Sequence, residues 1–504
     1  MTSAPPRRPR SLALVALAAV LAVGSFAFDA LAPSTNARAA DPGVRGRAHG
    51  KPHPSHEIYG YLPYWQVAGG TVDALDYRRL STIAFFAVPI RKTGYLQRSS
   101  SGYKAYVGTA GRAVINASHA RGIRVVPTFQ LFDHGSVSRM RHFLASPRVQ
   151  TRFIRQALAL MARRRADGAN IDFEPIPASL APRFAVFVRR FGRAIHHRFL
   201  GSRLVVATPA IVSDRVLRSL RPVVDRFFVM AYDYHWRGST RPGAVAPLKT
   251  GPHNVAKTIR NYLRLIPRKK LILGVPFYGY SWPVHHTAKG YRVRAHPGRF
   301  GGVRAVTYAG VRDWLREHPS VRVHRDRAGG SWFRYWNSAD GTTRQVHFED
   351  PRSARAKFNL AIANGLAGVG IWALENDDGY AGMQSALDAI FVHPTRRLVV
   401  RSHMTSVRRT SGIVRSRVRV TVRDRGSRAE RGILYWRVLD SHGRTVARGR
   451  RVIAVYPGRR TAVGLTIRLG PAHRLVAGRY RLRVTFKAPG HAWRAPPLRF
   501  RQPY

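Results

Sequence analysis

Short apolar stretches that favour β-strands alternate with longer helix-like stretches from Ile58 onward, and this rhythm constrains the fold more than any other feature. The helix-like stretches include VQTRFIRQALALMARRR from Val149 and ARAKFNLAIANG from Ala354. Such an alternation is typical of parallel βα units. The strand candidates are IYGYLPYW from Ile58, TIAFFAVP from Thr82, IRVVPTFQ from Ile123, ANIDFEPI from Ala169, RLVVATPA from Arg203, RFFVMAYDY from Arg226, KLILGVPFYGY from Lys270 and AGVGIWALE from Ala367.

Eight such units match the strand count of a (β/α)₈ TIM barrel, an α/β fold. An open doubly wound sheet is the alternative, but no glycine-rich phosphate loop follows the first strand candidate. The stretch between the seventh and eighth candidates contains the β-like pieces GYRVRAHP, SVRVHRD, SWFRYWN and TRQVHFED and the helix-like piece TYAGVRDWLREHP. We expect these pieces to form a small α+β insertion at about residues 285–350 of a barrel domain that spans residues 56–396.

Beyond about residue 397 the pattern changes to a strict alternation of apolar residues with arginine. Val418, Val420 and Val422 alternate with Arg419 and Arg423, and AGRYRLRVTFK repeats the pattern further along. Period-two alternation with glycine turns indicates antiparallel strands that have one solvent-exposed face. We expect residues 397–504 to form an all-β sandwich, which serves either as a wall- or glycan-binding module or as a spacer.

The first forty residues have the pattern of an export signal. Arginines near the N-terminus precede an uncharged apolar run from Leu12 to Phe28, and ARA at residues 37–39 fits a small-x-small cleavage site. The alternative is a membrane anchor that is retained. We expect a signal peptide over residues 1–40, a linker rich in Gly, Pro and His over residues 41–55, and a secreted or cell-wall-associated protein.

The chain carries 86 Lys and Arg against 25 Asp and Glu, a formal net charge of +61, and it has no cysteine. The lack of cysteine excludes disulfides and thiolate metal sites. The arginines are spread along the chain without a recognisable nucleic-acid reader motif, so we expect no specific nucleic-acid partner. Separately, we expect a monomeric protein. Attraction to an anionic surface such as a cell wall is one explanation of the charge, and a compositional bias toward arginine is the other.

Three acids fall within the stretch DGANIDFEP at residues 167–175, although the chain is poor in carboxylates. On a strand, Asn170, Asp172 and Glu174 share one face, and the opposite face is apolar. Reactive groups of a barrel gather at the carboxyl ends of its strands. Because Pro175 should end the strand, we expect Glu174 at the barrel mouth, with Asp172 one layer below it.

Two close carboxylates repel each other when both are ionised, so one of them holds its proton more tightly. A glutamic acid that stays protonated near neutral pH can donate that proton to a leaving group. The alternative is a structural cluster, in which Asp172 and Asn170 only form hydrogen bonds in the core. Buried acids without partners are costly, which favours the functional interpretation.

DGANIDFE at residues 167–174 resembles the DGxDxDxE signature of glycoside hydrolase family 18. MAYD at residues 230–233 resembles the family's MxYD segment, Trp372 resembles the tryptophan of its eighth strand, and Tyr61 resembles its first-strand aromatic residue. The phrase VHFEDPRSARAKFNLAIANGLAGVGIW resembles the spore-germination and cortex-lytic branch of the family. The resemblance covers roughly residues 58–391 and includes the insertion.

The resemblance implies hydrolysis of β-1,4 bonds next to N-acetylglucosamine, with retention of configuration and with the substrate's own acetamide as the nucleophile. It implies that Glu174 acts as the acid and then as the base, while Asp172 holds the acetamide N–H. Tyr232 would hydrogen-bond the acetamide carbonyl, Asp233 would contact the sugar, and Trp372 would stack beneath the ring. Core packing is the alternative for Tyr232 and Trp372. Further substrate-binding positions implied by the resemblance are Asn170, Tyr61 and Met230.

Asn170 stands where most chitinases of the family have Asp, and the resemblance implies that Asn is usual in the spore-germination and cortex-lytic branch. This shifts the expected substrate from crystalline chitin toward peptidoglycan. A non-catalytic lectin on the same barrel is one alternative, but such relatives usually lack the terminal Glu, which is present here as Glu174. A polyanion-binding surface protein is the other alternative.

Other residues give weaker indications. Trp65, Trp236 and Trp282 follow strand candidates, and they either extend a sugar-stacking groove or pack as caps. The histidine pairs at residues 196–197 and 285–286 lack the spacing of metal ligands. The sequence has no P-loop and no G-x-S-x-G elbow. We therefore expect neither a metal nor a cofactor.

Overall fold

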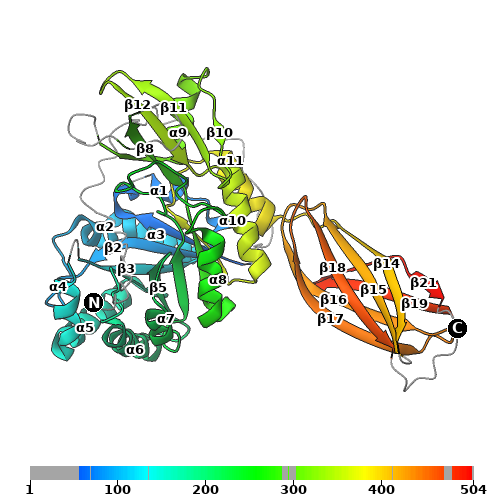
Figure 1. The fold of residues 1–504 in the computed structure, drawn as a ribbon. Helices are drawn as coiled ribbons and strands as arrows, with labels where there is room; N and C mark the ends of the chain where they lie inside the picture. The colour runs from blue at the N-terminus through cyan, green and yellow to red at the C-terminus, as the bar shows by residue number, and fades with distance from the viewer. Residues whose placement is uncertain are drawn as a thin grey trace, which may run out of the picture.

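The computed structural model describes residues 56–68, 70–133, 136–285, 293, 302–410, 413–469 and 479–501. The expected signal peptide and linker lie outside these residues. Within the described part of the chain, no helix combines the length and the apolar character needed to cross a membrane. Figure 1 shows a barrel ringed by helices and, to its side, an elongated all-β part.

Eight parallel strands close into a barrel, which confirms the fold that the sequence rhythm predicts. Around the barrel the strands follow the order β1-β13-β7-β6-β5-β4-β3-β2. Most strand residues are buried, because side chains fill the interior and helices cover the outside. The bounds are β1 Glu57–Pro63, β2 Thr82–Pro89, β3 Arg124–Phe132, β4 Gly168–Glu174, β5 Arg203–Pro209, β6 Arg226–Met230, β7 Leu271–Pro276 and β13 Gly368–Trp372.

The barrel helices form a ring outside the strands (Figure 1). Several of them begin at a side-chain cap, as Ser100, Ser146 and Asn254 each accept a hydrogen bond from a backbone N–H of the first turn. The helices are α1 Thr71–Ala74, α2 Ser101–Val107, α3 Thr109–Ala120, α4 Ser138–Ala145, α5 Pro147–Arg164, α6 Ala181–Arg198, α7 Asp214–Leu220, α8 Val255–Leu265, α10 Pro351–Asn364 and α11 Ala381–Leu387. The short turns are η1 Tyr64–Gln66, η2 Tyr77–Arg79, η3 Arg268–Lys270 and η4 Asp388–Val392.

Strand β4 is fixed at its start and along its outer face. Gly168 has a φ of 151°, and a Cβ at this position would lie 2.0 Å from the carbonyl oxygen of Arg203 on β5, so the position requires glycine. On the outer face, the ring of Phe173 stacks on that of Phe187 of α6, with centroids 5.6 Å apart. Because side chains alternate along a strand, this packing also fixes the direction of the inward-facing residues of β4.

In its described residues, the insertion is a five-stranded antiparallel sheet with one helix, and the strand order is β10-β11-β12-β8-β9. It begins at Tyr278, earlier than the expected residue 285, because the run from Lys270 contains two strands. Strand β7 ends at Pro276, and the chain then pairs with β12 instead of the barrel. Of the expected piece GYRVRAHP, the structure describes only Val293. The elements are β8 Tyr278–Val284, β9 Arg304–Thr307, α9 Tyr308–Glu317, β10 His324–Arg325, β11 Ser331–Asn337 and β12 Thr342–Phe348.

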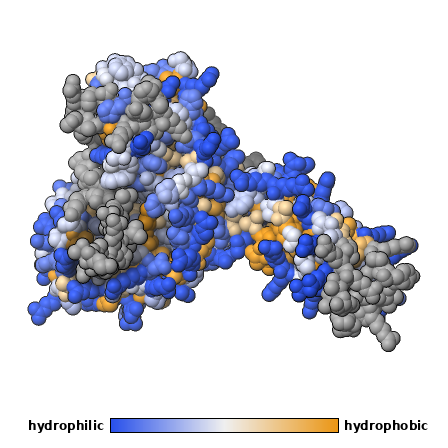
Figure 2. Space-filling view, in the orientation of Figure 1, coloured by the Kyte–Doolittle hydropathy of each residue, from blue (hydrophilic) through white to orange (hydrophobic). Residues whose placement is uncertain are grey.

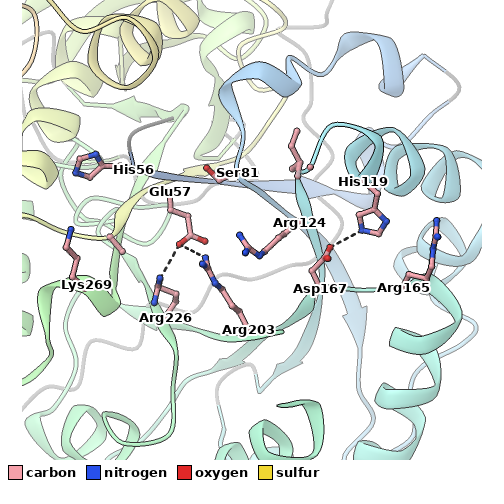
Figure 3. A pocket seen from close by; sticks show the side chains of 13 residues that line it. His56, Glu57, Ser81, His119, Arg124, Arg165, Asp167, Arg203, Arg226 and Lys269 are labelled. Atoms are coloured by element: carbon pink, nitrogen blue, oxygen red, sulfur yellow. Dashed lines mark hydrogen bonds and ion pairs between the residues drawn. The ribbon is translucent and has the colours of Figure 1, made fainter. Parts of the chain in front are cut away.

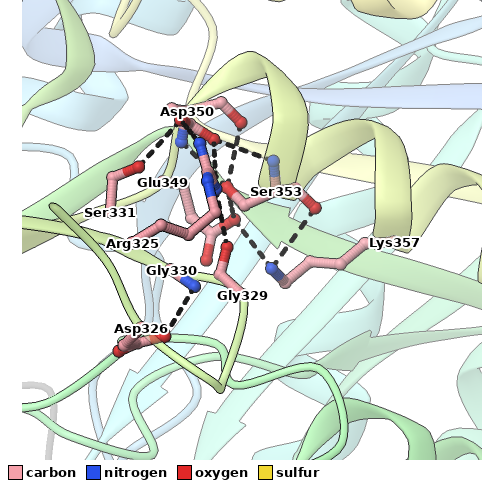
Figure 4. Close-up of polar contacts among 9 residues, drawn as sticks. All are labelled: Arg325, Asp326, Gly329, Gly330, Ser331, Glu349, Asp350, Ser353 and Lys357. Atoms are coloured by element: carbon pink, nitrogen blue, oxygen red, sulfur yellow. Dashed lines mark hydrogen bonds and ion pairs between the residues drawn. The ribbon is translucent and has the colours of Figure 1, made fainter.

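Polar contacts join the insertion to the start of α10 (Figure 4). Asp350 caps the helix by accepting a hydrogen bond of 2.8 Å from the Ser353 N–H, and the Ser353 hydroxyl accepts one of 2.9 Å from the Asp350 N–H. Asp350 also accepts hydrogen bonds from Ser331 and Arg325 of the insertion. Nearby, Glu349 and Lys357 form an ion pair of 2.7 Å in which both side chains are 1% exposed. These contacts hold the insertion against the helix that leads into β13.

The described residues from 398 to 501 form two antiparallel sheets around one shared apolar core, which confirms the expected β-sandwich. One sheet has the order β14-β15-β18, and the other has the order β17-β16-β19-β20, with β21 paired to β19. The bounds are β14 Leu398–Thr410, β15 Ile413–Asp424, β16 Glu430–Leu439, β17 Thr445–Val455, β18 Arg460–Leu469, β19 Arg479–Ala488, β20 His491–Arg494 and β21 Leu498–Arg501. The exact division of the chain into domains at residues 396 and 397 stays a prediction.

Candidate active site

Strand β4 brings Asn170, Asp172 and Glu174 to the interior and the mouth of the barrel. In the register with β3, Asp172 lies beside Gln130, and Glu174 lies beside Phe132, the last residue of β3. Asn170 is 0% and Asp172 is 4% exposed, whereas Glu174 is half-buried and reaches solvent. The exposure therefore increases toward the carboxyl end of the strand, where barrel enzymes hold their reactive groups.

Asn170 connects this strand to an aromatic cluster. Its Nδ2 donates hydrogen bonds to the Tyr61 hydroxyl at 3.0 Å and to the Thr128 hydroxyl at 3.3 Å. The Tyr61 ring lies edge-on to the Trp372 ring, with centroids 5.2 Å apart, and Phe86 packs against both rings. Tyr61 is buried, but Trp372 is half-buried at the carboxyl end of β13, so part of its surface is open to a ligand.

A side-chain hydrogen bond joins Asp172 and Glu174, which we call the acidic pair. Burial raises the pKa of Asp172 to about 7, and the hydrogen bond to Glu174 opposes this rise. Burial raises the pKa of Glu174 well above its ordinary value, and the negative charges of Asp172 and Asp233 raise it further. The pair therefore retains a proton at neutral pH. The hydrogen bond between the two acids lowers the pKa of Asp172 and raises that of Glu174, which is the direction expected when Glu174 carries the proton.

Three acceptor atoms of β4 have no hydrogen-bond partner among the described residues: Asn170 Oδ1, Asp172 Oδ1 and Glu174 Oε1. All three atoms are buried. An unpaired buried acceptor costs about 1–3 kcal/mol. A ligand that carries N–H or O–H groups would satisfy these acceptors and recover that free energy.

Tyr232 and Asp233 follow β6 at the same end of the barrel. Burial raises the pKa of the Tyr232 hydroxyl well above its ordinary value, and the charges of Asp233 and of the acidic pair raise it further, so Tyr232 lies within electrostatic reach of the pair. Asp233 has a left-handed backbone, with a φ of 57°, and accepts hydrogen bonds from the hydroxyls of Tyr278 and Tyr280. Burial raises the pKa of Asp233 to about 6, although these two hydrogen bonds oppose the rise.

Residues 134–377 match the family model of glycosyl hydrolases family 18. The family assignment therefore holds for this stretch, which makes up 244 of the chain's 504 residues. The chain is 27% identical over 369 residues to YdhD of Bacillus subtilis (strain 168), which is named as a sporulation-specific glycosylase, and the match covers 69% of this chain and 81% of that protein. It is 30% identical over 152 residues to the cortical fragment-lytic enzyme of the same organism, covering 30% of this chain and 32% of that one. The protein is therefore a glycosidase.

Solved structures share the barrel fold. The spore cortex-lytic enzyme SleL of Bacillus cereus aligns with a TM-score of 0.54 and 20% identity, over 66% of this chain and 73% of that chain. The Group IV chitinase of Ostrinia furnacalis, in complex with allosamidin, aligns with a TM-score of 0.57 and 19% identity, over 66% of this chain and 98% of that chain.

The sequence reasoning missed the two tyrosines that bind Asp233. Tyr278 and Tyr280 stand two residues apart on β8, so they share one face of the strand. Their period-two spacing directly after Pro276 was the available signal. The insertion of this glycosidase thus supplies side chains to the mouth of the barrel.

A second acidic group also escaped the sequence reasoning. It lies in the loop after Trp372, where burial raises the pKa of Glu375 to about 7 and that of Asp377 to about 6. Between them, Asn376 accepts a hydrogen bond of 3.3 Å from Gln66, which follows β1. The run ENDD at residues 375–378, shortly after the eighth strand, was the signal for this group.

The tryptophans expected near the groove differ from one another. Trp65 and Trp236 are half-buried and reach solvent. Of the two roles expected for Trp282, the structure shows packing, because this residue is 0% exposed in β8. Its ring centroid lies 5.8 Å from that of His347, and its indole N–H donates to the Trp236 carbonyl. Met230 is buried at the end of β6, and its contact with substrate stays a prediction.

A separate cavity of about 950 Å³ lies at the opposite end of the barrel, where the strands begin (Figure 3). There Glu57 binds Arg203 and Arg226 at 3.1 and 3.2 Å. Asp167, the first acid of DGANIDFEP, pairs with His119 at 2.9 Å. These pairs join neighbouring segments at the base of the barrel, so Asp167 has a structural role that is separate from the acidic pair.

The described residues contain no group of three or more His, Asp or Glu side chains that could hold a metal ion. His196 instead lies 2.8 Å from Asp225. His286, of the second histidine pair, lies outside the described residues.

Proposed function

We propose that this glycosidase hydrolyses β-1,4 bonds next to N-acetylglucosamine by substrate-assisted, retaining catalysis. The observation that carries the proposal is the acidic pair at the barrel mouth, in which Glu174 has a strongly raised pKa and both acids have an unpaired acceptor atom. One protonated and one ionisable carboxyl group side by side provide an acid for the leaving group and an acceptor for a donor group of the substrate.

In the first step, Glu174 transfers its proton to the glycosidic oxygen as the bond between that oxygen and the anomeric carbon breaks. The acetamide oxygen of the substrate attacks the anomeric carbon and forms an oxazolinium-like ring. Asp172 accepts a hydrogen bond from the acetamide N–H and stabilises the positive charge that develops. The Tyr232 hydroxyl donates to the acetamide oxygen and holds it in position for the attack.

In the second step, the Glu174 carboxylate removes a proton from a water molecule whose oxygen attacks the anomeric carbon. The ring opens, the sugar leaves with its original configuration, and Glu174 is protonated again. Trp372 stacks beneath the sugar, and Asp233 and Asn170 hold its polar groups. Because an Asn cannot take up a proton, the acidic pair shares its proton without help from residue 170.

We propose peptidoglycan as the natural polymer, with chitin-type oligomers as weaker substrates. Asn170 favours this choice, and relatives named for spore cortex lysis support it. The Cycas revoluta chitinase solved with (GlcNAc)4 shares the barrel fold, which supports N-acetylglucosamine as the recognised sugar. The export pattern of residues 1–40 supports a secreted or wall-associated enzyme.

Product analysis tests this proposal. Purified peptidoglycan and chitin oligomers are treated in parallel, products are identified by mass spectrometry, and the first anomer formed is read by NMR. We expect new N-acetylglucosamine reducing ends from peptidoglycan, with the β-anomer appearing first. New N-acetylmuramic acid reducing ends, an α-anomer, or tight binding without any product would overturn the proposal, and the last outcome would indicate a lectin.

A further inference from the structure

The C-terminal sandwich is more basic than the rest of the chain. Residues 397–504 contain 27 Lys and Arg and three Asp and Glu, a net charge of +24, whereas the other 396 residues carry the remaining +37. Per residue, the sandwich is more than twice as basic, so a uniform bias toward arginine does not explain its charge. Hydrophilic side chains cover much of the visible surface of both parts of the molecule (Figure 2).

The three acids of the sandwich already have partners. Glu430 lies 3.2 Å from Arg396, Asp440 lies 3.0 Å from Arg444, and Asp424 accepts a hydrogen bond from a backbone N–H. The excess positive charge of the sandwich is therefore not neutralised by its own acids.

The strand register gathers part of this charge on the outer face of the larger sheet. Opposite residues of neighbouring strands form three rows across this face: Arg448, Arg437 and Arg483; Arg450, Tyr435, Thr485 and Arg494; Val452, Ile433, Lys487 and Ala492. The six cations in these rows are all exposed, and we call them the basic face. The inner face of the same strands is apolar, with Leu434, Val438, Leu482 and Val484 buried in the core.

The first row places three arginines directly opposite one another on β17, β16 and β19. Like charges in opposite positions of a sheet destabilise it. Within the described residues, no ion pair joins any of the six cations to an acid. Lys487 lies over the ring of Tyr435, with its Nζ 5.6 Å from the ring centroid. The fold thus holds these cations close together, and their mutual repulsion costs free energy that a bound polyanion would remove.

The basic face is also hollowed. Its side chains line a cavity of about 1100 Å³, which includes Tyr435, Arg437, Arg483 and Arg494. Neighbouring strands lie about 4.8 Å apart, and residues i and i+2 of one strand lie about 7 Å apart. The face therefore presents a lattice of positive charges with a spacing of about 5 to 7 Å.

We propose that the basic face binds a linear phosphodiester-linked polyol or sugar polymer, such as an anionic wall polymer. Guanidinium groups bind phosphate oxygens through paired hydrogen bonds, and the lattice allows successive phosphates to meet successive arginines. Nucleic acid also carries phosphates, but proteins that hold single strands add several aromatic rings for base stacking. The rows of this face offer one aromatic ring, Tyr435. Trp436 also lines the cavity, but it packs against the apolar core of the sandwich, so the face favours a polymer without bases. This binding does not depend on hydrolysis.

The test compares two triple variants of the full chain that lose the same charge. The first is R437Q/R448Q/R483Q, which removes the arginine row. The control is R401Q/R417Q/R419Q on the smaller sheet, where these exposed arginines oppose no other arginine. The probe is fluorescently labelled poly(glycerol phosphate), and binding is measured by anisotropy at about 0.15 M salt, where long-range attraction is screened.

We expect the row variant to bind the probe at least about tenfold more weakly and the control to change less than about twofold, since only the row variant loses the bidentate contacts to phosphate. The row variant should also have an equal or higher melting temperature, which shows that it is folded. If both variants lost the same affinity for the probe, binding would depend only on net charge, and this result would overturn the proposal. The proposal would also be overturned if the wild-type protein bound single-stranded DNA with the same number of phosphates more tightly than it bound the probe.

Discussion

Asn170 adds neither a charge nor a titratable group to the acidic pair, since an amide side chain does not take up a proton. It donates hydrogen bonds to Tyr61 and Thr128 and leaves the proton between Asp172 and Glu174. A third acid at this position would add a negative charge and a further place for the proton. The proposed chemistry therefore depends on two carboxyl groups and on the neighbouring charges that adjust their pKa values.

We predict that Tyr232→Phe lowers the rate more than it weakens binding. The hydroxyl should interact more strongly with the acetamide as charge develops than in the bound substrate. kcat should fall by about tenfold or more, with the Kd of a chitin oligomer nearly unchanged. Steady-state kinetics and calorimetry check this, with Tyr95→Phe, an exposed tyrosine, as the control. Equal losses in kcat and in affinity would count against a role of the Tyr232 hydroxyl in stabilising the developing charge.

We predict that Asp233→Asn moves the alkaline limb of the pH–rate profile to lower pH. The negative charge of Asp233 contributes to the raised pKa of Glu174, so its removal lowers that pKa. Glu174 must be protonated to act as the acid, and activity should therefore disappear at a lower pH than in the wild type. If the alkaline limb stayed in place or moved to higher pH, the charge of Asp233 would not be raising the pKa of Glu174.

Alternation along β4 was sufficient to predict that Asn170, Asp172 and Glu174 share a face and that Glu174 lies nearest solvent. The partners of Asp233 could not be found in this way, because they come from an element whose position depends on pairing with a distant strand. The same cause left two roles open for Trp282, because the sequence could not show that this residue belongs to the insertion sheet. The local sequence pattern specifies which face of a strand a side chain occupies, whereas the pairing of distant strands specifies which residues lie next to it.

The insertion and α10 are joined by a buried ion pair, whose partners depend on each other. Lys357→Met would leave the Glu349 carboxylate buried without a counter-charge, and we expect a loss of about 3–5 kcal/mol in the free energy of unfolding. The double variant E349Q/K357M should recover a large part of this loss, since no unpaired charge remains. Urea unfolding measures both.

The destabilisation by Lys357→Met should also depend on pH. Glu349 has a raised pKa because it is buried, and without Lys357 its pKa would rise further. As the pH falls, Glu349 becomes protonated in both the folded and the unfolded protein, so the stability of the variant should approach that of the wild type. Two results together would show that Lys357 acts only by packing. The double variant would be no more stable than Lys357→Met, and the loss in the free energy of unfolding would not change with pH.

The barrel and the sandwich meet at α10, beside which the sandwich lies in Figure 1. Asn359 of α10 accepts a hydrogen bond from the buried Ala429 N–H, and Arg431 donates one of 2.9 Å to the Ala363 carbonyl. The sequence predicted both parts of the molecule, because each has its own periodicity. It could not predict this contact, since neither side carries a pattern that identifies the other.

We predict that Asn359→Ala loosens this contact, because it leaves the Ala429 N–H buried without an acceptor at a cost of about 1–3 kcal/mol. Hydrogen exchange of the backbone amides at residues 426–431 should become faster, while exchange in β4 stays the same. Asn364→Ala on the same helix is the control, since Asn364 bonds only within α10. Unchanged exchange at 426–431, or equal acceleration in β4, would contradict a local role.

For the molecule as a whole, we propose that the barrel mouth is the catalytic centre and that Glu174 supplies the proton. The most direct test compares Glu174→Gln with Glu317→Gln, an exposed control on α9, by measuring turnover and binding of N-acetylglucosamine oligomers. We predict that Glu174→Gln lowers kcat by about 10²- to 10⁴-fold and leaves the Kd within a fewfold of wild type, while the control is unaffected. Turnover by Glu174→Gln at the wild-type rate would contradict the account.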